Sequence, residues 1–325
     1  MPSEFVFVTG ASGFIGSHVA RALAAEGYRV RALVRRAGAQ VEGAQIVSGD
    51  LTRAGELVRA MRGCQFLVHC AALYSFAPRD RSMMQRVNVA GTAAVLEAAR
   101  VAGVQRAVVT SSGSTVGPAK NGIAATEKMH AFDAGGSAYH RSKLEQERAA
   151  LAARVPVVLL LPSAPVGPGD WKPTPTGRLV LDFARGRIPA RPSGGGLNLV
   201  AVEDVASAHV AALRHGTPRE RYLIGGENLS FDQLWELLAE VTGRRAPTFR
   251  LPHVVALTAG VLDELRCRIV PRSEPAVPLE GVRMAREHMY VDCSKAKQEL
   301  AYRAGSVRGA LARAVAWYRA NGYLN

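Results

Sequence analysis

The sequence of 325 residues predicts an α/β protein built on a doubly wound parallel sheet. Three observations support this fold class. Short apolar segments recur along the first half of the chain, without the alternation typical of half-exposed strands. Segments with helical periodicity separate them, and a glycine-rich turn follows the first apolar segment directly. Helices are therefore expected on both faces of the sheet.

The predicted elements alternate along the first half of the chain and then become sparse. We expect strands at residues 5–9, 29–34, 44–47, 66–70, 107–111 and 155–161. Helices are expected at 16–27, 54–61, 83–102 and 137–153. Residues 165–196 contain many Pro and Gly, which predicts loops over a site. Further elements are expected at 179–185, 197–202, 203–215, 231–242 and 307–321.

The turn after the first strand has glycines at Gly10, Gly13 and Gly16. Gly10 allows a tight turn, Gly13 lets backbone amides approach a pyrophosphate, and Gly16 lets the next helix pack closely on the sheet. The helix then offers free N–H groups and the positive end of its dipole to phosphates. The alternative is a plain strand–turn–helix connection. Further contacts to a dinucleotide are expected from Ser12, Phe14 and Ile15.

The second strand indicates which dinucleotide binds. An acidic residue at its end holds the ribose of NAD, but residues 30–36 contain no acid. Arg35 and Arg36 can instead pair with the 2′-phosphate of NADP, unless they are only solvated surface charges. Asp50 and Leu51, after the third strand, are expected to meet the adenine. Small residues after the fourth strand, Ala71 and Ala72, are expected to let the backbone approach the cofactor.

Lys143 lies four positions after Tyr139 within a predicted helix, so both side chains lie on one face. A phenol with a free pKa of about 10 is a weak proton donor. A neighbouring ammonium stabilises the phenolate and lowers that pKa, which suits general acid–base catalysis beside a nicotinamide. The spacing also occurs by chance, in which case Tyr139 is a surface residue.

A serine-rich segment follows the fifth strand, shortly before the predicted Tyr–Lys helix. We expect the Ser112 hydroxyl to hold the substrate oxygen near Tyr139, with Ser114 as the second candidate; a simple turn hydroxyl is the alternative. Asn88 lies inside a predicted helix, where Asn has poor propensity, and is expected to be a polar anchor to the active site rather than a surface residue. Ser111 and Pro162 complete the expected cofactor contacts.

Together these motifs resemble the extended short-chain dehydrogenase/reductase family, also called NAD-dependent epimerases/dehydratases. The resemblance extends over nearly the whole chain, through residues 162–169, 199–205 and 294–300. Residues 27–35 resemble the dihydroflavonol-4-reductase branch, in which the Arg matching Arg35 serves NADP. Residues 172–178 and 225–229 resemble a group labelled hopanoid-associated sugar epimerases. Many sugar-acting relatives have Arg-Pro where this chain has Leu161-Pro162.

The resemblance implies two lobes and a homodimer. An NADP-binding Rossmann domain is expected at residues 1–165, with 197–226 returning to it, and a substrate-binding lobe at 166–196 and 227–325. The loops that select the substrate are expected at 73–84, 165–196 and 255–290, with Tyr74, Phe76 and Trp171 either stacking on a ring or filling the lobe interface. Relatives dimerise through the helices that match 83–102 and 137–153, and in this family the Lys also holds the nicotinamide ribose.

These patterns predict an NADP(H)-dependent oxidoreductase that reduces a ketone or aldehyde, or oxidises the alcohol. The alternative is a nucleotide-sugar epimerase or dehydratase, which oxidises and re-reduces one substrate without net cofactor turnover. A third reading is a non-catalytic NADP sensor, which would not need Ser112, Tyr139 and Lys143 together.

Composition narrows the choice of partners. The net charge of +14 comes mostly from 35 Arg, which are spread along the chain without a nucleic-acid-binding motif. The four Cys are scattered without metal-ligand spacing, so we expect free thiols and no metal. No apolar run approaches the roughly 20 residues that span a bilayer, so no membrane partner is expected. The N-terminus lacks signal-peptide features, which predicts a cytoplasmic protein.

Overall fold

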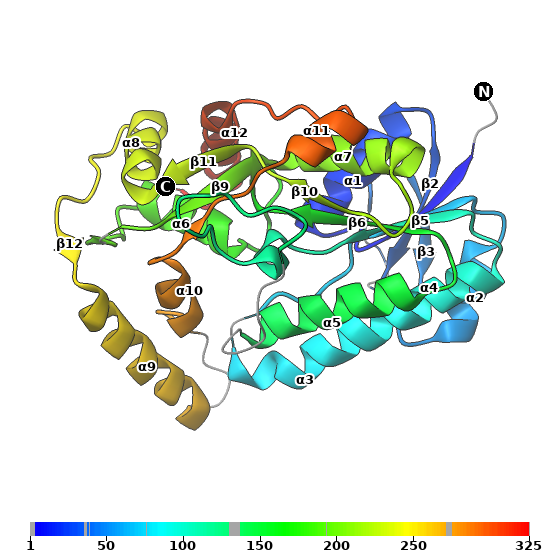
Figure 1. The fold of residues 1–325 in the computed structure, drawn as a ribbon, viewed down its shortest axis with the longest axis horizontal. Helices are drawn as coiled ribbons and strands as arrows, with labels where there is room; N and C mark the ends of the chain where they lie inside the picture. The colour runs from blue at the N-terminus through cyan, green and yellow to red at the C-terminus, as the bar shows by residue number, and fades with distance from the viewer. Residues whose placement is uncertain are drawn as a thin grey trace.

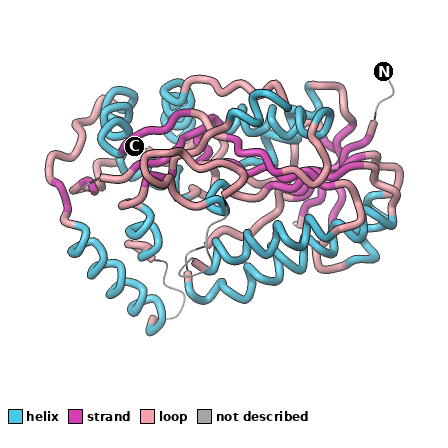
Figure 2. Tube along the Cα trace, in the orientation of Figure 1, coloured by secondary structure: helices cyan, strands magenta, loops and turns pink. Residues whose placement is uncertain are grey.

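The computed structural model describes residues 4–35, 38, 40–75, 77–129, 137–192, 194–270 and 275–324. Its main layer is a seven-stranded sheet with helices on both faces, and a smaller assembly of strands and helices adjoins one end (Figures 1 and 2). Every strand pair in the large sheet is parallel, so the predicted doubly wound α/β fold is confirmed.

The large sheet has the strand order β10-β6-β5-β4-β1-β2-β3. Its strands are β1 (Phe5–Thr9), β2 (Arg29–Val34), β3 (Ala44–Ser48), β4 (Phe66–His69), β5 (Arg106–Thr110), β6 (Val157–Pro162) and β10 (Arg221–Ile224). The order reverses beside β1, and in such sheets ligands bind outside the carboxyl ends of the strands at this switch point. The glycine turn begins there, at Gly10.

Helices of two groups cover the sheet (Figure 1). On one face lie α1 (Phe14–Ala25) and α7 (Val202–His215), which pack against each other. On the other lie α2 (Ala54–Met61), α3 (Arg81–Met84), α4 (Gly91–Val101) and α5 (Ala138–Ala152). The predicted helix 83–102 is in fact three segments, because the π-helical turn η2 (Gln85–Ala90) lies between α3 and α4. Such turns are frequent at functional sites, and this one contains Asn88.

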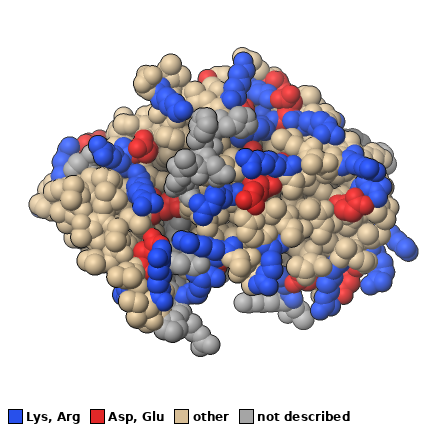
Figure 3. Space-filling model, turned by 60° about the horizontal axis from the view of Figure 1, so that its bottom comes forward, with Lys and Arg blue, Asp and Glu red and all other residues tan. Residues whose placement is uncertain are grey.

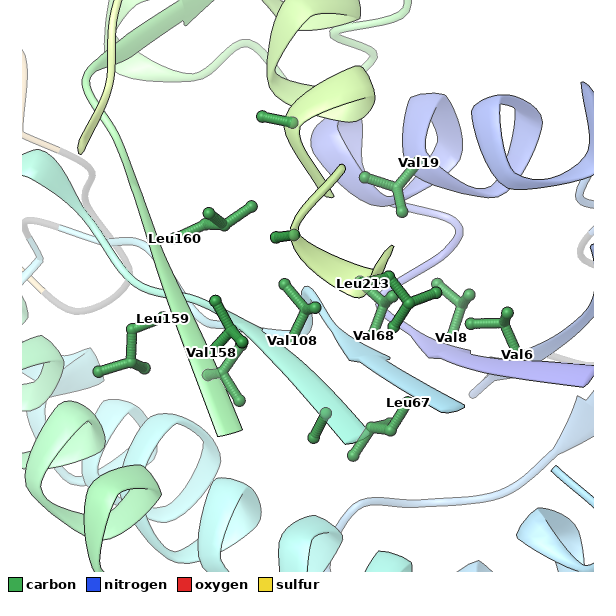
Figure 4. Close-up of a cluster of buried hydrophobic side chains, with 14 of the residues drawn as sticks. Val6, Val8, Val19, Leu67, Val68, Val108, Val158, Leu159, Leu160 and Leu213 are labelled. Atoms are coloured by element: carbon green, nitrogen blue, oxygen red, sulfur yellow. The ribbon is translucent and has the colours of Figure 1, made fainter. Parts of the chain in front are cut away.

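The core explains why the strands lack alternation. Side chains on both faces of the sheet are buried, as Figure 4 shows: Val8 and Val68 face Leu213 of α7, whereas Leu67 and Leu159 point toward the opposite helices. Burying one such side chain contributes roughly 1.5–3 kcal/mol. A sheet covered on both faces therefore needs nearly continuous apolar strands.

The smaller assembly is built around β9 (Gly196–Ala201), which pairs with β7 (Ala164–Val166), β11 (Glu227–Ser230) and β13 (His288–Met289). Its helices are α6 (Pro175–Ala184), α8 (Phe231–Thr242) and α12 (Val307–Ala320). These pack a second apolar cluster in which Phe183 stacks on Trp235. α8 begins with a reciprocal capping box between Ser230 and Gln233. The predicted domain boundaries stay a prediction.

The prediction of a loop at 255–290 is wrong. This stretch contains most of α9 (His253–Ile269) as well as α10 (Leu279–Met284). The helical periodicity is weak because Val, Leu and Ala occur on all sides of the first turn of α9. The remaining elements are η1 (Pro78–Asp80), η3 (Gly113–Val116), β8 (Arg191–Pro192), β12 (Arg250–Leu251) and α11 (Ser294–Glu299). In the described part of the chain, no helix has the length and apolar character that crossing a membrane requires.

Candidate active site

The structure brings Ser112, Tyr139 and Lys143 to the carboxyl end of the sheet. Ser112 follows β5 and caps η3, where its hydroxyl accepts a hydrogen bond from the Ser114 amide at 3.2 Å. Tyr139 and Lys143 lie one turn apart in α5, which begins after a side-chain cap by Ser137. The Ser112 hydroxyl also hydrogen-bonds the Tyr139 hydroxyl. Two hydroxyl groups therefore converge where a substrate oxygen would bind.

The acidity of Tyr139 differs from the expectation. Burial raises the pKa of Tyr139 to about 12, and the hydrogen bond with Ser112 opposes this only in part. The prediction that Lys143 lowers this pKa is therefore wrong for the protein alone. The Lys143 ammonium is directed elsewhere, because Nζ donates to the Thr110 carbonyl at 2.9 Å and to Gln146 Oε1 at 2.5 Å.

Lys143 is itself strongly affected by its surroundings. It is almost fully buried, and this desolvation lowers the pKa of Lys143 to about 8, although the Glu147 carboxylate partly offsets the effect. Charged and neutral forms of the side chain therefore both occur a little above neutral pH. A buried Lys with such a pKa is typical of functional sites.

A buried chain of hydrogen bonds runs from Lys143 to the end of β1. Gln146 accepts from Lys143 through Oε1 and donates through Nε2 to Thr92 Oγ1 at 3.0 Å. Thr92 gives its own proton to the Asn88 carbonyl, at 2.6 Å. His69 Nε2, 2.9 Å from Thr92 Oγ1, must therefore be a donor.

The other ring nitrogen of His69 completes this series of hydrogen bonds. Nδ1 then accepts the hydroxyl proton of Thr9, at 2.6 Å. Burial lowers the pKa of His69 to about 3, which keeps the ring neutral as this arrangement requires. Because Thr9 immediately precedes Gly10, these hydrogen bonds connect Lys143 to the glycine turn.

Asn88 is the anchor that its helical position predicts. Its Oδ1 accepts from the Leu73 amide at 2.7 Å, and its Nδ2 donates to the Leu73 carbonyl at 3.0 Å and to Ser142 Oγ at 2.9 Å. Asn88 thus fixes the strand-end segment that contains Leu73 to α5. Its side-chain bonds go to protein groups, so a direct contact with the cofactor stays a prediction.

Ser111 also has a protein partner. Its hydroxyl donates to Glu147 Oε1 at 2.5 Å, and Glu147 Oε2 lies 3.1 Å from Arg221 Nε in a buried ion pair. Arg221 begins β10 and also donates to Thr115 Oγ1 at 3.1 Å. This cluster ties α5, β10 and η3 together directly behind the Ser–Tyr pair.

The glycine turn fits a dinucleotide phosphate. Gly10 has φ +71°, and a Cβ on it would lie 2.6 Å from the Ala71 amide, so β1 and β4 approach too closely for any side chain. A Cβ on Gly16 would lie 2.1 Å from the Gly10 carbonyl oxygen. α1 begins with no side-chain cap and no acid in its first turn, which leaves its N–H groups and dipole available to an anion. Ser12 and Gly13 complete this turn, and Phe14 and Ile15 begin α1.

The residues expected at the adenosine lie at the ends of β2 and β3. Arg35 is exposed, and its charge, together with hydrogen bonds from Thr52, helps to lower the pKa of Asp50. Leu51 is buried beside them. A cation and an acceptor are therefore available near one another for a phosphorylated ribose and an adenine. Arg36 lies outside the described residues.

The remaining predicted positions lie along the same edge of the sheet. The Ala71 amide donates weakly to Thr9 Oγ1 at 3.4 Å, and Ala72 is exposed in the segment that follows. Pro162 ends β6, and its carbonyl would lie 3.2 Å from a Cβ on Gly113. This edge is therefore closely packed backbone, as the small residues predict.

Two of the three candidate aromatic residues are described. Tyr74 packs edge-on against Tyr139, with ring centroids 4.1 Å apart, so it lies directly beside the Tyr139 ring. Trp171 packs instead on Trp317 of α12, with centroids 4.7 Å apart. Phe76 lies outside the described residues.

The residues packed behind Tyr139 and Lys143 were not predicted from the sequence. Gln146 and Glu147 are polar residues three and four positions beyond Lys143, on the side of the helix that it shares, and this spacing is a usable signal. Thr92 lies four residues after Asn88, a spacing that also places two polar side chains on the same side of a helix. The roles of His69 and Arg221 depend on contacts between distant segments.

The parallel sheet, the glycine turn and the Ser–Tyr–Lys arrangement define an oxidoreductase that uses a nicotinamide nucleotide. Residues 6–225 match the model of the NAD dependent epimerase/dehydratase family, and the chain belongs to this family. The resemblance inferred from the motifs is thereby confirmed.

Curated relatives match over almost the full length. The "Putative dihydroflavonol 4-reductase" of Synechocystis sp. is 40% identical over 99% of this chain and 96% of its own. The Sterol demethylase protein B of Methylococcus capsulatus is 34% identical over 98% of this chain and 99% of its own.

Solved structures agree with this assignment. The crystal structure of gox2253 superimposes with a TM-score of 0.86 and 35% identity, over 99% of this chain and 100% of that one. MoeE5 in complex with UDP-glucose and NAD has a TM-score of 0.75 and 26% identity, over 97% and 99% of the two chains.

Proposed function

We propose that the protein is an NADP(H)-dependent carbonyl reductase with Tyr139 as the proton donor. The observation that carries this proposal is the convergence of the Ser112 and Tyr139 hydroxyls on one point. A carbonyl oxygen held by both groups would receive hydrogen bonds that strengthen as negative charge develops on it. When bound, the nicotinamide supplies the hydride for reduction or takes it up for oxidation.

The protonation state of Tyr139 favours reduction. With a pKa raised to about 12, the phenol keeps its proton at neutral pH and can give it to the forming alkoxide. Oxidation of an alcohol would need the phenolate, which is scarce in the protein alone. Lys143 would hold the nicotinamide ribose, while the hydrogen bond to Gln146 keeps the Lys143 ammonium in place.

Arg35 supports NADP as the cofactor. Its exposed guanidinium stands at the end of β2, where NAD-binding chains place a carboxylate. A charge-assisted contact with the 2′-phosphate is worth roughly 1.5–3 kcal/mol. We place the reaction in the cytoplasm, with residues 1–165 and 197–226 holding the cofactor and residues 166–196 and 227–325 the substrate.

An apolar carbonyl compound is the substrate class best supported. The two curated relatives are named for a dihydroflavonol and a sterol, which are both largely apolar ring systems. Leu161, at the position where many sugar-acting members have Arg, is fully buried in β6 and brings no cation to the site. Tyr74 offers an aromatic surface directly beside Tyr139.

A nucleotide-sugar epimerase or dehydratase is the second candidate. It is favoured by the family to which the chain belongs and by the fold shared with MoeE5, which binds UDP-glucose and NAD. Such an enzyme returns its hydride to the same substrate and retains its cofactor through the cycle.

Cofactor stoichiometry separates the two candidates. Purified protein should consume NADPH one for one with members of a panel of apolar ketones and aldehydes. Tyr139→Phe should abolish this consumption while the protein still binds NADPH. Isomerisation of a nucleotide sugar with unchanged NADPH absorbance would refute the reductase and establish the second candidate.

A further inference from the structure

α9 exposes an unusually apolar face. Five large apolar side chains lie along one side of this helix and form an apolar stripe. They are Val254, Val261, Leu262, Leu265 and Ile269. All five are among the exposed large apolar residues of the described chain. Scattered exposed apolar residues are ordinary, but a continuous stripe on a single helix indicates a surface that contacts something.

The opposite side of α9 is packed. Gly260 is buried against α10, where a Cβ on it would lie 3.1 Å from Leu279 Cα. Asp263 accepts a hydrogen bond from the Val277 amide at 2.8 Å. The inner side of α9 is thus packed through Gly260 and hydrogen-bonded through Asp263. The apolar stripe is on the opposite, outward side of the helix.

Arginines border the stripe on both sides. Each residue of a helix is turned by about 100° from the one before it. Seen along the helix axis, Arg266 therefore lies next to Val255 at one edge of the stripe, and Arg268 lies next to Val261 at the other edge. Each pairs with an acid of its own helix, but the acids lie further inward. Asp263 is 10% exposed against 45% for Arg266, and Glu264 is 26% exposed against 58% for Arg268. The outward surface is therefore aliphatic with a cationic rim.

The end of the molecule that carries α9 stands apart from the main sheet (Figure 1). In Figure 3 this end shows a broad area of uncharged residues, bordered by Lys and Arg side chains with Asp and Glu among them. α9 packs on α10 and η1. Glu280 of α10 hydrogen-bonds the Ser137 backbone, and its charge adds to the effect of burial, which is the main cause of the raised pKa of Tyr74. The helix pair therefore adjoins the active site.

We propose that α9 is an interfacial helix that lies on the surface of an anionic lipid bilayer. Its aliphatic stripe would enter the boundary between headgroups and acyl chains, while Arg266 and Arg268 extend to the phosphates. The net charge of +14 favours an anionic surface over a neutral one. A peripheral contact needs no spanning segment, so this proposal revises the expectation that the protein has no membrane partner.

A second copy of the chain is the less suitable occupant. Two such faces would bring four rim arginines together, and like charges oppose that contact. A bilayer containing acidic lipids neutralises the same charges.

Vesicle sedimentation with the full chain tests the proposal. Wild-type protein should pellet with mixed phosphatidylcholine–phosphatidylglycerol vesicles and much less with phosphatidylcholine alone. Leu262→Glu should weaken this binding about tenfold or more, because it places a charge where an aliphatic side chain enters the lipid. Ile123→Glu is the matched control, since the two side chains are 61% and 64% exposed and the charge change is identical.

The control separates a specific face from general attraction. Retained binding by Ile123→Glu together with loss in Leu262→Glu supports the proposal. Equal loss in both variants would show that overall charge alone drives binding, and this overturns the proposal. It is also overturned if wild-type protein stays in the supernatant with both vesicle types, or if Leu262→Glu instead converts a dimer to a monomer. None of these outcomes depends on the proposed reductase activity.

Discussion

The ammonium group of Lys143 donates a hydrogen bond to the side-chain oxygen of Gln146, 2.5 Å away and one turn further along α5. This contact favours the charged form of a side chain whose pKa burial has lowered to about 8. Gln146 is held in this orientation by Thr92, which is fixed in turn by Asn88 and His69. The charge of Lys143 therefore depends on Gln146, whose side chain is directed to Lys143 and Thr92.

Gln146→Leu should shift the pH profile of the enzyme. Without its acceptor, the Lys143 ammonium is less stable and its pKa falls further below about 8. The alkaline limb of kcat/KM for NADPH, which reports the free enzyme, should move to lower pH by about one unit. Gln146→Glu should move it in the opposite direction, because a carboxylate stabilises the ammonium. An unmoved limb in both variants would show that Gln146 has only a packing role.

Tyr139→Phe should separate catalysis from cofactor binding. The change removes the positioned acid and leaves the ring, so turnover should fall by about 10² or more with NADPH affinity nearly unchanged. Lys143→Ala should weaken both, since this side chain is expected to hold the ribose as well. Steady-state kinetics and fluorescence titration of NADPH measure the two effects. Full activity in Tyr139→Phe would mean that the proton comes from another group.

Arg35→Ala should remove most of the preference for NADPH. We expect wild-type protein to bind NADPH at least about tenfold more tightly than NADH, since one charge-assisted phosphate contact is worth roughly 1.5–3 kcal/mol. Calorimetric titration of both nucleotides measures the ratio. Arg59→Ala, an exposed Arg on α2, should leave it unchanged. Equal affinities in the wild type would contradict the assignment of NADP.

Arg221→Leu should destabilise the protein strongly. It leaves Glu147 buried without its cation, and breaking a buried ion pair from one side costs about 3–5 kcal/mol. Urea unfolding should show a lower free energy of unfolding for this variant. Replacing both residues with Leu should recover part of the loss, because the buried carboxylate is then removed together with its cation, while Lys143 loses the nearby Glu147 charge that partly offsets its burial. A double variant less stable than Arg221→Leu would show that Glu147 stabilises the fold mainly through Ser111.

The sheet and glycine turn were predictable because local patterns determine them. The strand at Phe5–Thr9 and the turn at Gly10 follow from apolar continuity and from a backbone approach that only Gly permits. α9 was missed because Val, Leu and Ala occur on all sides of its first turn, so the spacing of apolar residues is not clearly helical. In α9 the residues around Leu262 point to the outside.

The site was predictable in its reacting groups but not in their energetics. Tyr139 and Lys143 are recognisable from spacing alone, whereas the pKa of Tyr139 depends on burial created by distant segments such as the one that contains Tyr74. The series of hydrogen bonds from Gln146 to Thr9 joins four elements that are far apart in the sequence. No local pattern encodes such contacts.

The protein should form a homodimer through α4 and α5. These helices lie side by side on one face of the sheet, along the lower side of the molecule in Figure 1, where α2 and α3 adjoin them. Small residues such as Ala93 and Ala149 are on their outer sides and permit close approach of a second copy. Light scattering at micromolar concentration should give twice the 34.6 kDa of one chain. Ala93→Glu combined with Ala149→Glu should halve the mass, because charges would face each other across the two-fold axis, whereas Ile123→Glu should not. A monomeric mass for wild-type protein would refute this prediction.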